Sequence, residues 1–296
     1  MRLKTINFDH TNYYRMQVFY DRISFSQYIE SQKDLRKTIG FAPTMGALHA
    51  GHISLYEAAK RENDIVISSV FVNPTQFNNP EDLEKYPRTL EDDIEKLKKS
   101  KLVDAVYIPG VEDIYPDGMR RKHYNFGGIE NEMEGAARPG HFDGVGTVVE
   151  ELFRQVQPDN AYFGEKDFQQ LKIIEKLVEV LNLDIKIHGV AIYREDNGLA
   201  MSSRNMRLTK QEKEASSVIF QTLKKVDDWF RVISIPEIKD RVSEIFDRKD
   251  MALEYFMIAD EKTLKEVDFF SEDRDYRAFI VVNVDKVRLI DNMHLT

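Results

Sequence analysis

Between residues 39 and 72 the hydrophobic pattern of the sequence changes in a way that few folds can accommodate. A short apolar run ends at Pro43-Thr44, and a helical pattern with apolar residues at Leu55, Ala58 and Ala59 follows a glycine-containing loop. A second apolar run at 65–72 has the length of a buried strand. Strand, loop, helix and strand within about thirty residues is the size of one βαβ unit, so we expect a parallel sheet.

The loop at 43–52 carries two histidines where such a unit would bind a ligand. It opens onto a helix N-terminus, whose free N–H groups and dipole favour phosphate. Gly46 and Gly51 leave space beside His49 and His52, so we predict a nucleotide site. Two other interpretations stay open. One histidine can be a core or capping residue. The pair can also bind a metal, although its spacing is not i, i+4 and no third ligand is evident.

Composition narrows the classes of protein to consider. The 296 residues carry a formal net charge of −9, which argues against general nucleic-acid binding. Cysteine is absent, which excludes disulfides, thiolate catalysis and zinc–thiolate sites and fits a reducing cytoplasm. No apolar run approaches the roughly eighteen residues of a membrane-spanning helix, and polar residues interrupt any N-terminal signal peptide. We therefore expect a cytoplasmic protein that binds neither nucleic acid nor membrane.

Strands alternate with helices along the first two thirds of the chain. Further strands are predicted near 17–23, 103–109, 160–163 and 185–190, and further helices near 26–36, 89–99, 145–156 and from about 167. This alternation predicts an α/β fold, with a Rossmann-like, mostly parallel sheet flanked by helices. Residues 1–15 are polar and aperiodic. We therefore interpret 1–15 as an N-terminal extension and 16–190 as a Rossmann-like domain.

The alternation of single strands and helices ends at about residue 190. Thr209 and Glu212 form a capping-box pattern at the start of a helix predicted to reach about Phe230. A second helix near 236–246 and strands near 253–258, 277–284 and 287–290 follow. We therefore assign 191–296 to a smaller C-terminal α+β lid domain.

A second ligand-binding segment is predicted at 163–170, where a short strand meets a helix. Lys166 places a cation at this point, and open α/β sheets bind ligands at the carboxyl ends of their strands. A purely structural interpretation also stays open, because Asp167 and Gln170 form a capping-box pattern and Gly164 suits a turn.

The segment 196–205 joins the two predicted domains. Its Ser202, Ser203 and Arg204 can bind a phosphate chain through two hydroxyls and a guanidinium. A surface linker whose serines cap the next helix explains the same pattern equally well.

Polar residues also follow the predicted strand at 65–72. Asn73 and Gln76 can bind a hydroxylated or carboxylate substrate beside the nucleotide, or satisfy the backbone of the loop. Asp92 and Asp93 can cap a helix or attract Mg²⁺. The polar segments lie at the carboxyl ends of predicted strands, so together they indicate one crevice.

Several blocks of the sequence resemble, in order, the motifs of one family. They are PTMGALHAGH at 43–52, FVNPTQF at 71–77, YPRT at 86–89, RPGHFDGV at 138–145, GEKDFQQL at 164–171 and GLAMSSRN at 198–205. The His-x-Gly-His loop with a later Met-Ser-Ser-Arg is similar to the signatures of the nucleotidyl-transferring Rossmann superfamily, which includes class I aminoacyl-tRNA synthetases. Within that superfamily the chain resembles the pantothenate synthetase (pantoate–β-alanine ligase) family over about 16–293, ending in RLIDN at 288–292.

This resemblance implies an ATP-dependent ligase. The carboxylate of (R)-pantoate would attack the α-phosphorus of ATP, which releases pyrophosphate and leaves a pantoyl adenylate. The amine of β-alanine would then attack the acyl carbon and release pantothenate and AMP. The resemblance also implies Mg²⁺ with the ATP, and a homodimer.

The resemblance implies roles for individual residues as well. The catalytic residues would be His52, His49, Lys166 and Arg204, with His52 as the proton donor. ATP would be bound by Met45, Gly46, Ala47, Leu48, His49, Ala50, Gly51, His52, Gly164, Glu165, Lys166, Asp167, Tyr193, Met201, Ser202, Ser203 and Arg204. Pantoate would be bound by Gln76, Gln170 and Asn73, with Gln76 near β-alanine as well. Tyr193 stands where a smaller aliphatic residue is common, a departure that a backbone contact to the nucleotide tolerates.

Two other functions fit parts of the pattern. A nucleotidylyltransferase of the same superfamily has a similar His-x-Gly-His loop, acts on a phosphorylated acceptor and usually carries a Ser-Ser-Thr-x-x-Arg signature. The segment 201–205 and the pair Gln76 and Gln170 favour a ligase instead. A non-catalytic nucleotide-binding regulator would keep the crevice and lose the phosphate-binding side chains, which are present in this sequence.

Overall fold

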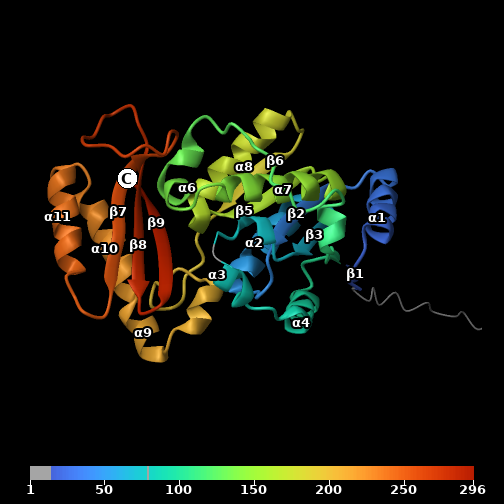
Figure 1. Cartoon of the computed structure of the whole chain (residues 1–296), viewed down its shortest axis with the longest axis horizontal. Helices are drawn as coiled ribbons and strands as arrows, with labels where there is room; N and C mark the ends of the chain where they lie inside the picture. The colour runs from blue at the N-terminus through green and yellow to red at the C-terminus, as the bar shows by residue number, and fades with distance from the viewer. Residues whose placement is uncertain (1–14, 79) are drawn as a thin grey trace, which may run out of the picture.

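The computed structural model describes residues 15–78 and 80–296, and its larger part is built on a parallel sheet. The strand order is β1-β4-β3-β2-β5-β6 (Figure 1), and each strand pairs with its neighbours in parallel. The strands are β1 (Gln17–Phe19), β2 (Ile39–Thr44), β3 (Ile65–Val70), β4 (Ala105–Tyr107), β5 (Asn160–Gly164) and β6 (Lys186–Val190). The chain builds outward from β2 in one direction and then from β5 in the other. The sheet therefore has a switch point between β2 and β5, where open α/β sheets bind ligands.

Helices cover both faces of this sheet. Successive strand residues point to opposite faces, so Phe41 packs in one hydrophobic core with α1, α7 and α8, while Ala42 packs in another with α2 and α4. The two helical layers lie on either side of the strands in Figure 1. These helices are α1 (Arg22–Asp34), α2 (Ala50–Glu62), α4 (Leu90–Ser100), α7 (His141–Val156) and α8 (Phe168–Leu181). Shorter helices in the connections are α3 (Pro80–Glu84), α5 (Val111–Ile114) and α6 (Met133–Ala137), with 3₁₀ turns η1 (Pro74–Gln76), η2 (Ile129–Asn131) and η3 (Glu165–Asp167).

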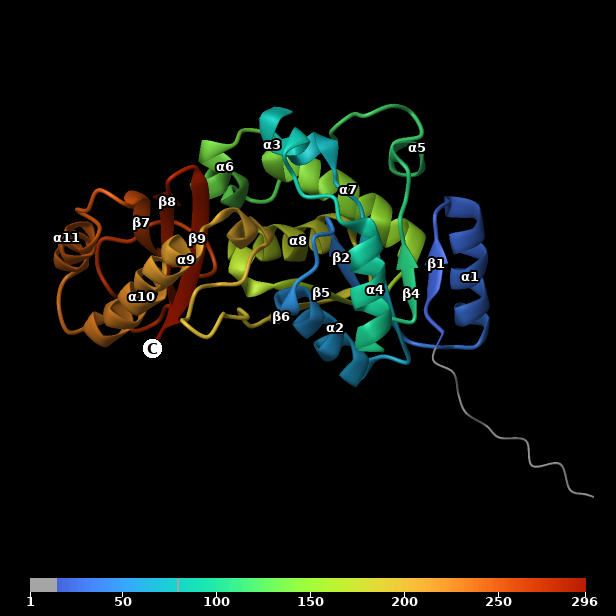
Figure 2. The same cartoon turned by 90° about the horizontal axis from the view of Figure 1, so that it is seen from below.

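An antiparallel sheet of three strands lies at the opposite end of the molecule from β1 (Figure 2). Its strands are β7 (Ala252–Asp260), β8 (Tyr276–Val284) and β9 (Val287–Leu295), and it follows η4 (Ser203–Arg207), α9 (Lys210–Ala215), α10 (Ser217–Trp229) and α11 (Ile235–Ile245). Ile280 on one face shares a core with residues of α10 and α11. Phe279 on the other face belongs to the core of the parallel sheet, and its ring centroid lies 6.1 Å from that of Phe168. The small sheet therefore packs on its own helices and on α8.

This architecture confirms the predicted fold class, a mostly parallel α/β sheet with a smaller C-terminal α+β part. The domain division at 190/191 and the lid role of 191–296 stay predictions. Residues 1–14 of the predicted N-terminal extension lie outside the described residues. Across 15–78 and 80–296, no helix combines the length and apolar character needed to cross a membrane.

Some predicted boundaries were wrong for local reasons. The first strand ends at Phe19 instead of 23, because the Asp21 side chain accepts a hydrogen bond from Ser24 N and caps α1. The helix predicted over 209–230 is divided into α9 and α10 at Ser216, whose hydroxyl donates to Glu212 O (2.7 Å). Such back-bonding bends helices. The helix expected from 145 begins at His141, which places the RPGH motif at its N-terminus.

Candidate active site

The loop between β2 and α2 is fixed by side chains of α4. Asp93 is fully buried; its Oδ2 accepts the N–H of Ala47 (2.9 Å) and its Oδ1 that of Leu48 (2.7 Å). Lys96 Nζ donates to Leu48 O (2.9 Å). Gly46 has a φ of 82°, which glycine adopts without strain, and a Cβ there would lie 3.1 Å from Asp93 Oδ2. The backbone is therefore held in place before it reaches the two histidines.

His49 and His52 stand at the N-terminus of α2. His49 is the N-cap residue, and its backbone N–H donates to His52 Nδ1 (3.2 Å). The two ring centroids are 4.0 Å apart. Because His52 Nδ1 accepts this hydrogen bond, the proton of its neutral imidazole sits on Nε2. The fold thus fixes the tautomer that leaves an Nε2–H donor.

Burial lowers the pKa of both imidazoles. Burial, and after it the charge of a protonated His49, lowers the pKa of His52 to about 3. Burial, and after it the charge of Lys166, lowers the pKa of His49 to about 4. Both rings are therefore uncharged at neutral pH. A neutral His52 can donate a hydrogen bond to a phosphate oxygen. The predicted role of proton donor further requires a bound anion that raises its pKa.

Gly51 makes room for the His49 ring. A Cβ at Gly51 would lie 3.0 Å from both Cε1 and Nδ1 of His49 and 3.7 Å from the Tyr193 Cβ. Tyr193 is 46% exposed, and its backbone carbonyl accepts the N–H of Met201 (2.9 Å). Glycine at position 51 therefore allows the histidine ring and the chain at 193 to approach each other closely.

Lys166 follows the carboxyl end of β5, in η3. Its side chain is 16% exposed, and its ammonium lies 3.8 Å from Asp167 Oδ1. Gly164 ends β5, and a Cβ there would meet no heavy atom within 4 Å, so the space beside it is open to a ligand. Asp167 is the N-cap residue of α8 but makes no side-chain capping hydrogen bond in the described structure. The capping-box interpretation of Asp167 and Gln170 was therefore wrong.

The segment 201–204 approaches from the C-terminal part of the chain. Ser202 Oγ accepts the N–H of Arg204 (3.3 Å) and caps η4, so the capping interpretation holds for this serine. Burial raises the pKa of Tyr86 against the opposing effects of a hydrogen bond with Ser203 and the charge of Arg204. These interactions connect the segment to the loop that precedes α4.

Gln76 is held from both its side chain and its backbone. Its Nε2 donates to Met45 Sδ (3.3 Å), and its Oε1 accepts from Asn73 Nδ2 (3.1 Å). Its carbonyl accepts from His141 Nδ1 (2.8 Å) and from an Arg138 Nη2 (3.3 Å). Burial lowers the pKa of His141 to about 4, with the Arg138 charge as the next cause. Gln76 is therefore presented from a rigid turn.

Asn73 has a structural role in that turn. It is 1% exposed; its Oδ1 accepts from the Tyr115 hydroxyl (2.5 Å) and from Thr75 N (3.3 Å). Its Nδ2 donates to Gly144 O (3.1 Å) as well as to Gln76. Both ends of the amide are engaged by the protein. Asn73 therefore supports the turn that holds Gln76, and its predicted contact with the substrate stays a prediction.

These segments meet in one cavity of about 270 Å³ at the switch point of the sheet. The predicted site residues that line it are Met45, His49, Gly51, His52, Asn73, Gln76, Gly164, Lys166, Asp167, Gln170, Tyr193, Met201, Ser202, Ser203 and Arg204. The structure therefore brings the four predicted catalytic residues together with both glutamines. Their roles stay predictions.

Some residues predicted to bind ATP do not line this cavity, namely Gly46, Ala47, Leu48, Ala50 and Glu165. The amides of Ala47 and Leu48 are directed to Asp93. The Glu165 carboxylate instead lies 3.8 Å from an Arg277 Nη1. Ala47, Leu48 and Glu165 therefore make contacts that support the site, and the predicted contacts of all five residues with the nucleotide stay predictions.

The structure does not bring Asp92 and Asp93 together as a Mg²⁺ site. Asp92 is exposed on α4, whereas Asp93 is buried with both oxygens on loop amides. Throughout 15–78 and 80–296, no group of three or more His, Cys, Asp or Glu side chains is arranged to hold a metal ion. Mg²⁺ needs carboxylate oxygens that are open to it, so these residues do not fit a metal site held by the protein.

Sequence reasoning missed the apolar wall of the cavity and several polar residues. The wall includes Val145, Val148, Val149 and Leu152 of α7, and Tyr86, Arg138 and His141 also line the cavity. The i, i+3, i+4, i+7 spacing of these four residues in the sequence indicates one apolar face of a helix. The sequence does not indicate that this face lines a ligand site, because the orientation of the face depends on how α7 packs on the sheet.

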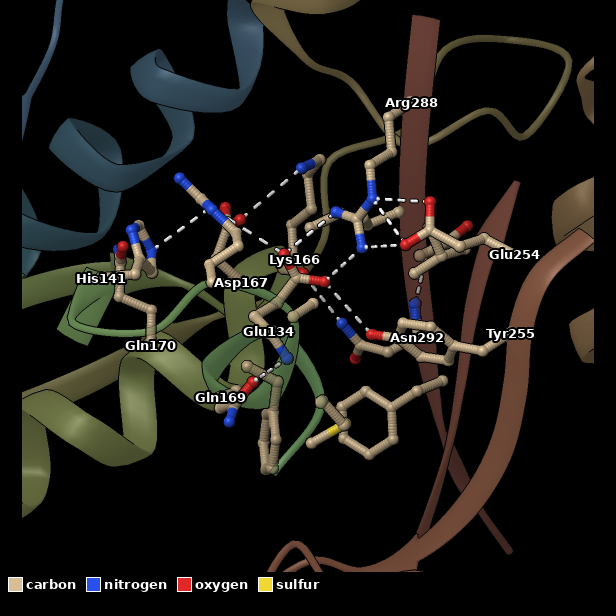
Figure 3. Close-up of a pocket in the computed structure, with 18 of the residues that line it drawn as sticks. Glu134, His141, Lys166, Asp167, Gln169, Gln170, Glu254, Tyr255, Arg288 and Asn292 are labelled. Atoms are coloured by element: carbon tan, nitrogen blue, oxygen red, sulfur yellow. Dashed lines mark hydrogen bonds and ion pairs between the residues drawn. The ribbon is translucent and has the colours of Figure 1, made fainter. Parts of the chain in front are cut away.

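A larger cavity of about 480 Å³ adjoins the first one, between α6, the start of α8 and the C-terminal sheet (Figure 3). The residues common to both are Phe77, Arg138, His141, Lys166, Asp167, Gln170 and Arg204. Arg288 of β9 pairs with Glu134 of α6 across it (2.6 Å), and the Tyr255 hydroxyl donates to Glu134 (3.2 Å). Lys166 and Arg204 thus stand where the two cavities meet.

Comparison with known proteins gives one consistent family. A family profile described as pantoate-beta-alanine ligase matches residues 17–294. The pantothenate synthetase of Flavobacterium psychrophilum is 49% identical over 95% of this chain and 100% of its own length, and that of Christiangramia forsetii is 48% identical over 95% and 99%.

Solved structures agree with this result. The pantothenate synthetase of Thermus thermophilus superposes with a TM-score of 0.85 at 37% identity, covering 94% of this chain and 99% of that one. The pantoate-beta-alanine ligase of Francisella tularensis, complexed with beta-gamma ATP and beta-alanine, gives a TM-score of 0.78 at 38% identity over 95% and 98%.

Proposed function

This chain belongs to the pantoate–β-alanine ligase family, and we propose that it condenses (R)-pantoate with β-alanine, using ATP, to give pantothenate, AMP and pyrophosphate. The reaction forms a carbon–nitrogen bond and supplies pantothenate for coenzyme A. The observation that carries the proposal is the cavity itself. Two amide side chains, Gln76 and Gln170, share it with the cations and histidines expected to bind a triphosphate.

In the first step a carboxylate oxygen of pantoate attacks the α-phosphorus of ATP. The bond from that phosphorus to the bridging oxygen of the β-phosphate breaks, and pyrophosphate leaves from a pantoyl adenylate. The substrate supplies the nucleophile, so the protein needs none of its own. Its contribution is positioning and the stabilisation of charge on the phosphates.

The charge is stabilised by groups from three segments. His49 and His52 donate from the N-terminus of α2, where the helix dipole also favours an anion. Lys166 contributes a cation from η3, and the segment 201–204 adds two hydroxyls and a guanidinium. Binding of the polyanion raises the pKa of the histidines from their low values, so His52 becomes protonated as charge develops on the leaving group.

In the second step the uncharged amine of β-alanine attacks the acyl carbon. The amide bond forms, the bond from the acyl carbon to the phosphate oxygen breaks, AMP leaves and the amine loses a proton. The apolar wall of α7 lies beside the predicted pantoate residues Gln76 and Gln170. We propose that this wall limits water near the acyl adenylate, which would otherwise hydrolyse.

Magnesium, a homodimer and a cytoplasmic location complete the proposal. Mg²⁺ enters as part of the ATP complex, held chiefly by phosphate oxygens and water, since the described residues hold no group of three or more His, Cys, Asp or Glu side chains arranged for a metal ion. The homodimer and the location rest on the resemblance and on the absence of cysteine. Light scattering after gel filtration tests the oligomeric state, where a mass of one chain would contradict the homodimer.

The test of the function is pantoate-dependent exchange of labelled pyrophosphate into ATP without β-alanine. We expect exchange with pantoate, and addition of β-alanine should convert it into net formation of pantothenate. Exchange that ignored pantoate but responded to another acid would contradict the substrate. Exchange with a phosphorylated acceptor instead would favour a nucleotidylyltransferase, and absence of any exchange would favour a non-catalytic regulator.

A further inference from the structure

The RLIDN run at 288–292 lies on β9, outside the parallel sheet that carries most of the site. Its last two residues are among the most buried polar groups of the C-terminal sheet, with Asp291 3% and Asn292 2% exposed. Buried polar groups need partners, so the partners of these two side chains show what the run does. Because consecutive strand residues point to opposite faces, the two side chains act on different parts of the molecule.

Asn292 points toward the parallel sheet and binds the turn that carries Lys166. Its Nδ2 donates to the backbone carbonyls of Glu165 (2.9 Å) and Lys166 (2.9 Å). Figure 3 shows Asn292 beside Lys166, at the edge of the larger cavity. Its amide group therefore holds η3 at two successive peptides.

Arg277 on the neighbouring strand β8 fixes the orientation of that amide. Its Nη1 donates to Asn292 Oδ1 (2.7 Å), so the NH₂ group of Asn292 must face the two carbonyls. Arg277 is 6% exposed, and its guanidinium lies 3.8 Å from the ring centroid of Phe168, the first residue of α8. The C-terminal sheet thus grips both the Lys166 turn and the helix that follows it.

Asp291 points to the other face and binds Arg194 with both oxygens. The distances are 2.6 Å from Nη1 to Oδ2 and 3.0 Å from Nη2 to Oδ1. The same guanidinium lies 3.9 Å from the Phe220 ring centroid and donates to Gly198 O (3.1 Å). Arg194 is therefore held between β9, α10 and its own turn.

That turn leads directly into the segment 201–204. Arg194 and Ala200 form an antiparallel bridge, Glu195 N donates to Leu199 O (2.8 Å), and Met201 N donates to the carbonyl of Tyr193 (2.9 Å). The stretch 193–201 is thus a small hairpin anchored through Arg194. The contacts that hold Arg194 therefore also determine the position of Ser202, Ser203 and Arg204, which follow the hairpin.

We propose that Asp291 and Asn292 are positioning residues of β9 that set the two phosphate-binding segments in register: Asn292 sets the Lys166 turn, and Asp291, through Arg194, sets the segment 201–204. The proposal rests on the proposed function in one respect, namely that these segments bind phosphates. Neither residue lines the smaller cavity, where the predicted catalytic residues meet. A shift of the C-terminal sheet changes both segments together, since one strand holds both.

The experiment is a double-mutant cycle on the affinity for β,γ-methylene-ATP, measured by calorimetry without pantoate. Asn292→Asp keeps the acceptor for Arg277 and removes both donors to η3. We expect it to weaken binding about tenfold in the parent protein and less than about twofold in a Lys166→Ala background. A merely structural residue would cost the same in both backgrounds, and that result would overturn the proposal for Asn292.

The second arm uses Asp291→Asn in the parent protein and in an Arg204→Ala background, with the same expected pattern. Asn283→Ala is the matched control, because Asn283 lies on the same sheet and its Nδ2 donates to Glu254 (3.0 Å) instead of to either segment. We expect the affinity of Asn283→Ala for β,γ-methylene-ATP to stay within about twofold of that of the parent protein. Unchanged affinity in both Asp291→Asn and Asn292→Asp overturns the proposal.

Folding and function are separated by two further measurements. Thermal unfolding identifies a variant that is not folded at the assay temperature. Arg194→Lys then replaces Asp291→Asn, because it removes the two-point pairing from the other side. Pantoate-dependent exchange is measured on the parent protein alone. A parent that shows the predicted coupling but no exchange would contradict the proposed function and leave the positioning of the segments standing.

Discussion

The two sides of the small cavity are held by different parts of the molecule. The loop at 44–52 is fixed within the parallel sheet, by Asp93 and Lys96 of α4 and by Thr44, whose hydroxyl donates to Ser69 O (2.8 Å). The segment 201–204 is fixed from outside that sheet, through the hairpin at 193–201 and Arg194 to β9. One side is therefore preorganised by its own core, whereas the position of the other follows the C-terminal sheet.

The two sides of the cavity are therefore expected to differ in rigidity. Groups on the loop at 44–52 keep their geometry whether or not a ligand is bound, because several buried hydrogen bonds specify the backbone. If 191–296 acts as the predicted lid, groups on 201–204 would approach or leave the phosphates together with the C-terminal sheet. Substitutions in the loop at 44–52 should lower the rate of the reaction. Substitutions in 201–204 should chiefly weaken the affinity for ATP.

The largest effect should come from the preorganised side. His52→Ala should lower pantoate-dependent exchange by about a hundredfold or more, the range for a lost acid or oxyanion-type donor. His52→Asn keeps an acceptor for the His49 N–H but lacks the Nε2–H donor of the imidazole. Compared with His52→Ala, it should therefore be more stable but no faster in exchange. His188→Ala is the control, since His188 stacks on Tyr162 (4.7 Å between centroids) and does not line the cavity. A near-normal rate for His52→Ala would remove His52 from the mechanism.

The next effect should fall on the anchor of the same loop. Asp93→Asn places an NH₂ group against one of two backbone N–H donors, so we expect the free energy of unfolding to fall by about 2 kcal/mol. Exchange should slow by about tenfold, because the histidines follow the loop. Denaturant unfolding and exchange rates measure both, and Asp92→Asn, at the exposed neighbour, should change neither.

The same pair of variants separates an anchor from a metal ligand. If Asp93 is an anchor, the Mg²⁺ concentration that gives half-maximal exchange should stay unchanged in Asp93→Asn. A large increase in that concentration, with unchanged stability, would restore Asp93 as a metal ligand.

The sequence predicted the parallel sheet and most of the cavity, because both depend on local pattern. The βαβ unit and the motif blocks placed His52, Lys166 and Arg204 at strand ends that must meet at one edge of the sheet. The sequence did not predict that Asp93 supports the loop, because its partners are backbone amides 45 and 46 residues away. Such partners leave no trace in side-chain spacing.

The roles of Asn73 and of β9 were hidden for a related reason. An asparagine after a strand is equally suited to binding a substrate and to satisfying a turn, and the Gly144 carbonyl that Asn73 binds is 71 residues away in the sequence. Asn292 is 126 residues from the Lys166 carbonyl that it binds. Contacts of that kind depend on how the two sheets pack together, which a hydrophobic pattern does not specify.

A moderate effect is expected from pH on the preorganised side. The pKa values of His49 and His52, about 4 and about 3 in the folded protein, lie below the roughly 6.5 of an unfolded chain. The unfolded state therefore binds more protons below that pH. Stability contributed by the neutral rings is complete above about pH 6.5 and is lost as the pH falls toward 4.

His52→Asn isolates the contribution of one ring. Between pH 6.5 and 4.5 the wild-type free energy of unfolding should fall by about 1–2 kcal/mol more than that of the variant, measured by urea unfolding at both pH values. Saturating β,γ-methylene-ATP should reduce this difference, because the phosphate charges raise the pKa of the ring. Equal pH dependence in the two proteins would contradict a buried neutral His52.

The smallest effect should come from the outer contact between the C-terminal sheet and α6. Arg288 binds Glu134 of α6 and Glu254 of β7, but its side chain is 30% exposed, so solvent weakens the pair. Arg288→Gln should lower stability by at most about 1 kcal/mol and change the KM for ATP less than about threefold. Arg248→Gln, which breaks the exposed pair with Asp250, is the matched control. A tenfold loss of ATP affinity in Arg288→Gln would mean that α6, and not the buried Asp291–Arg194 pair, sets where 201–204 meets the phosphates.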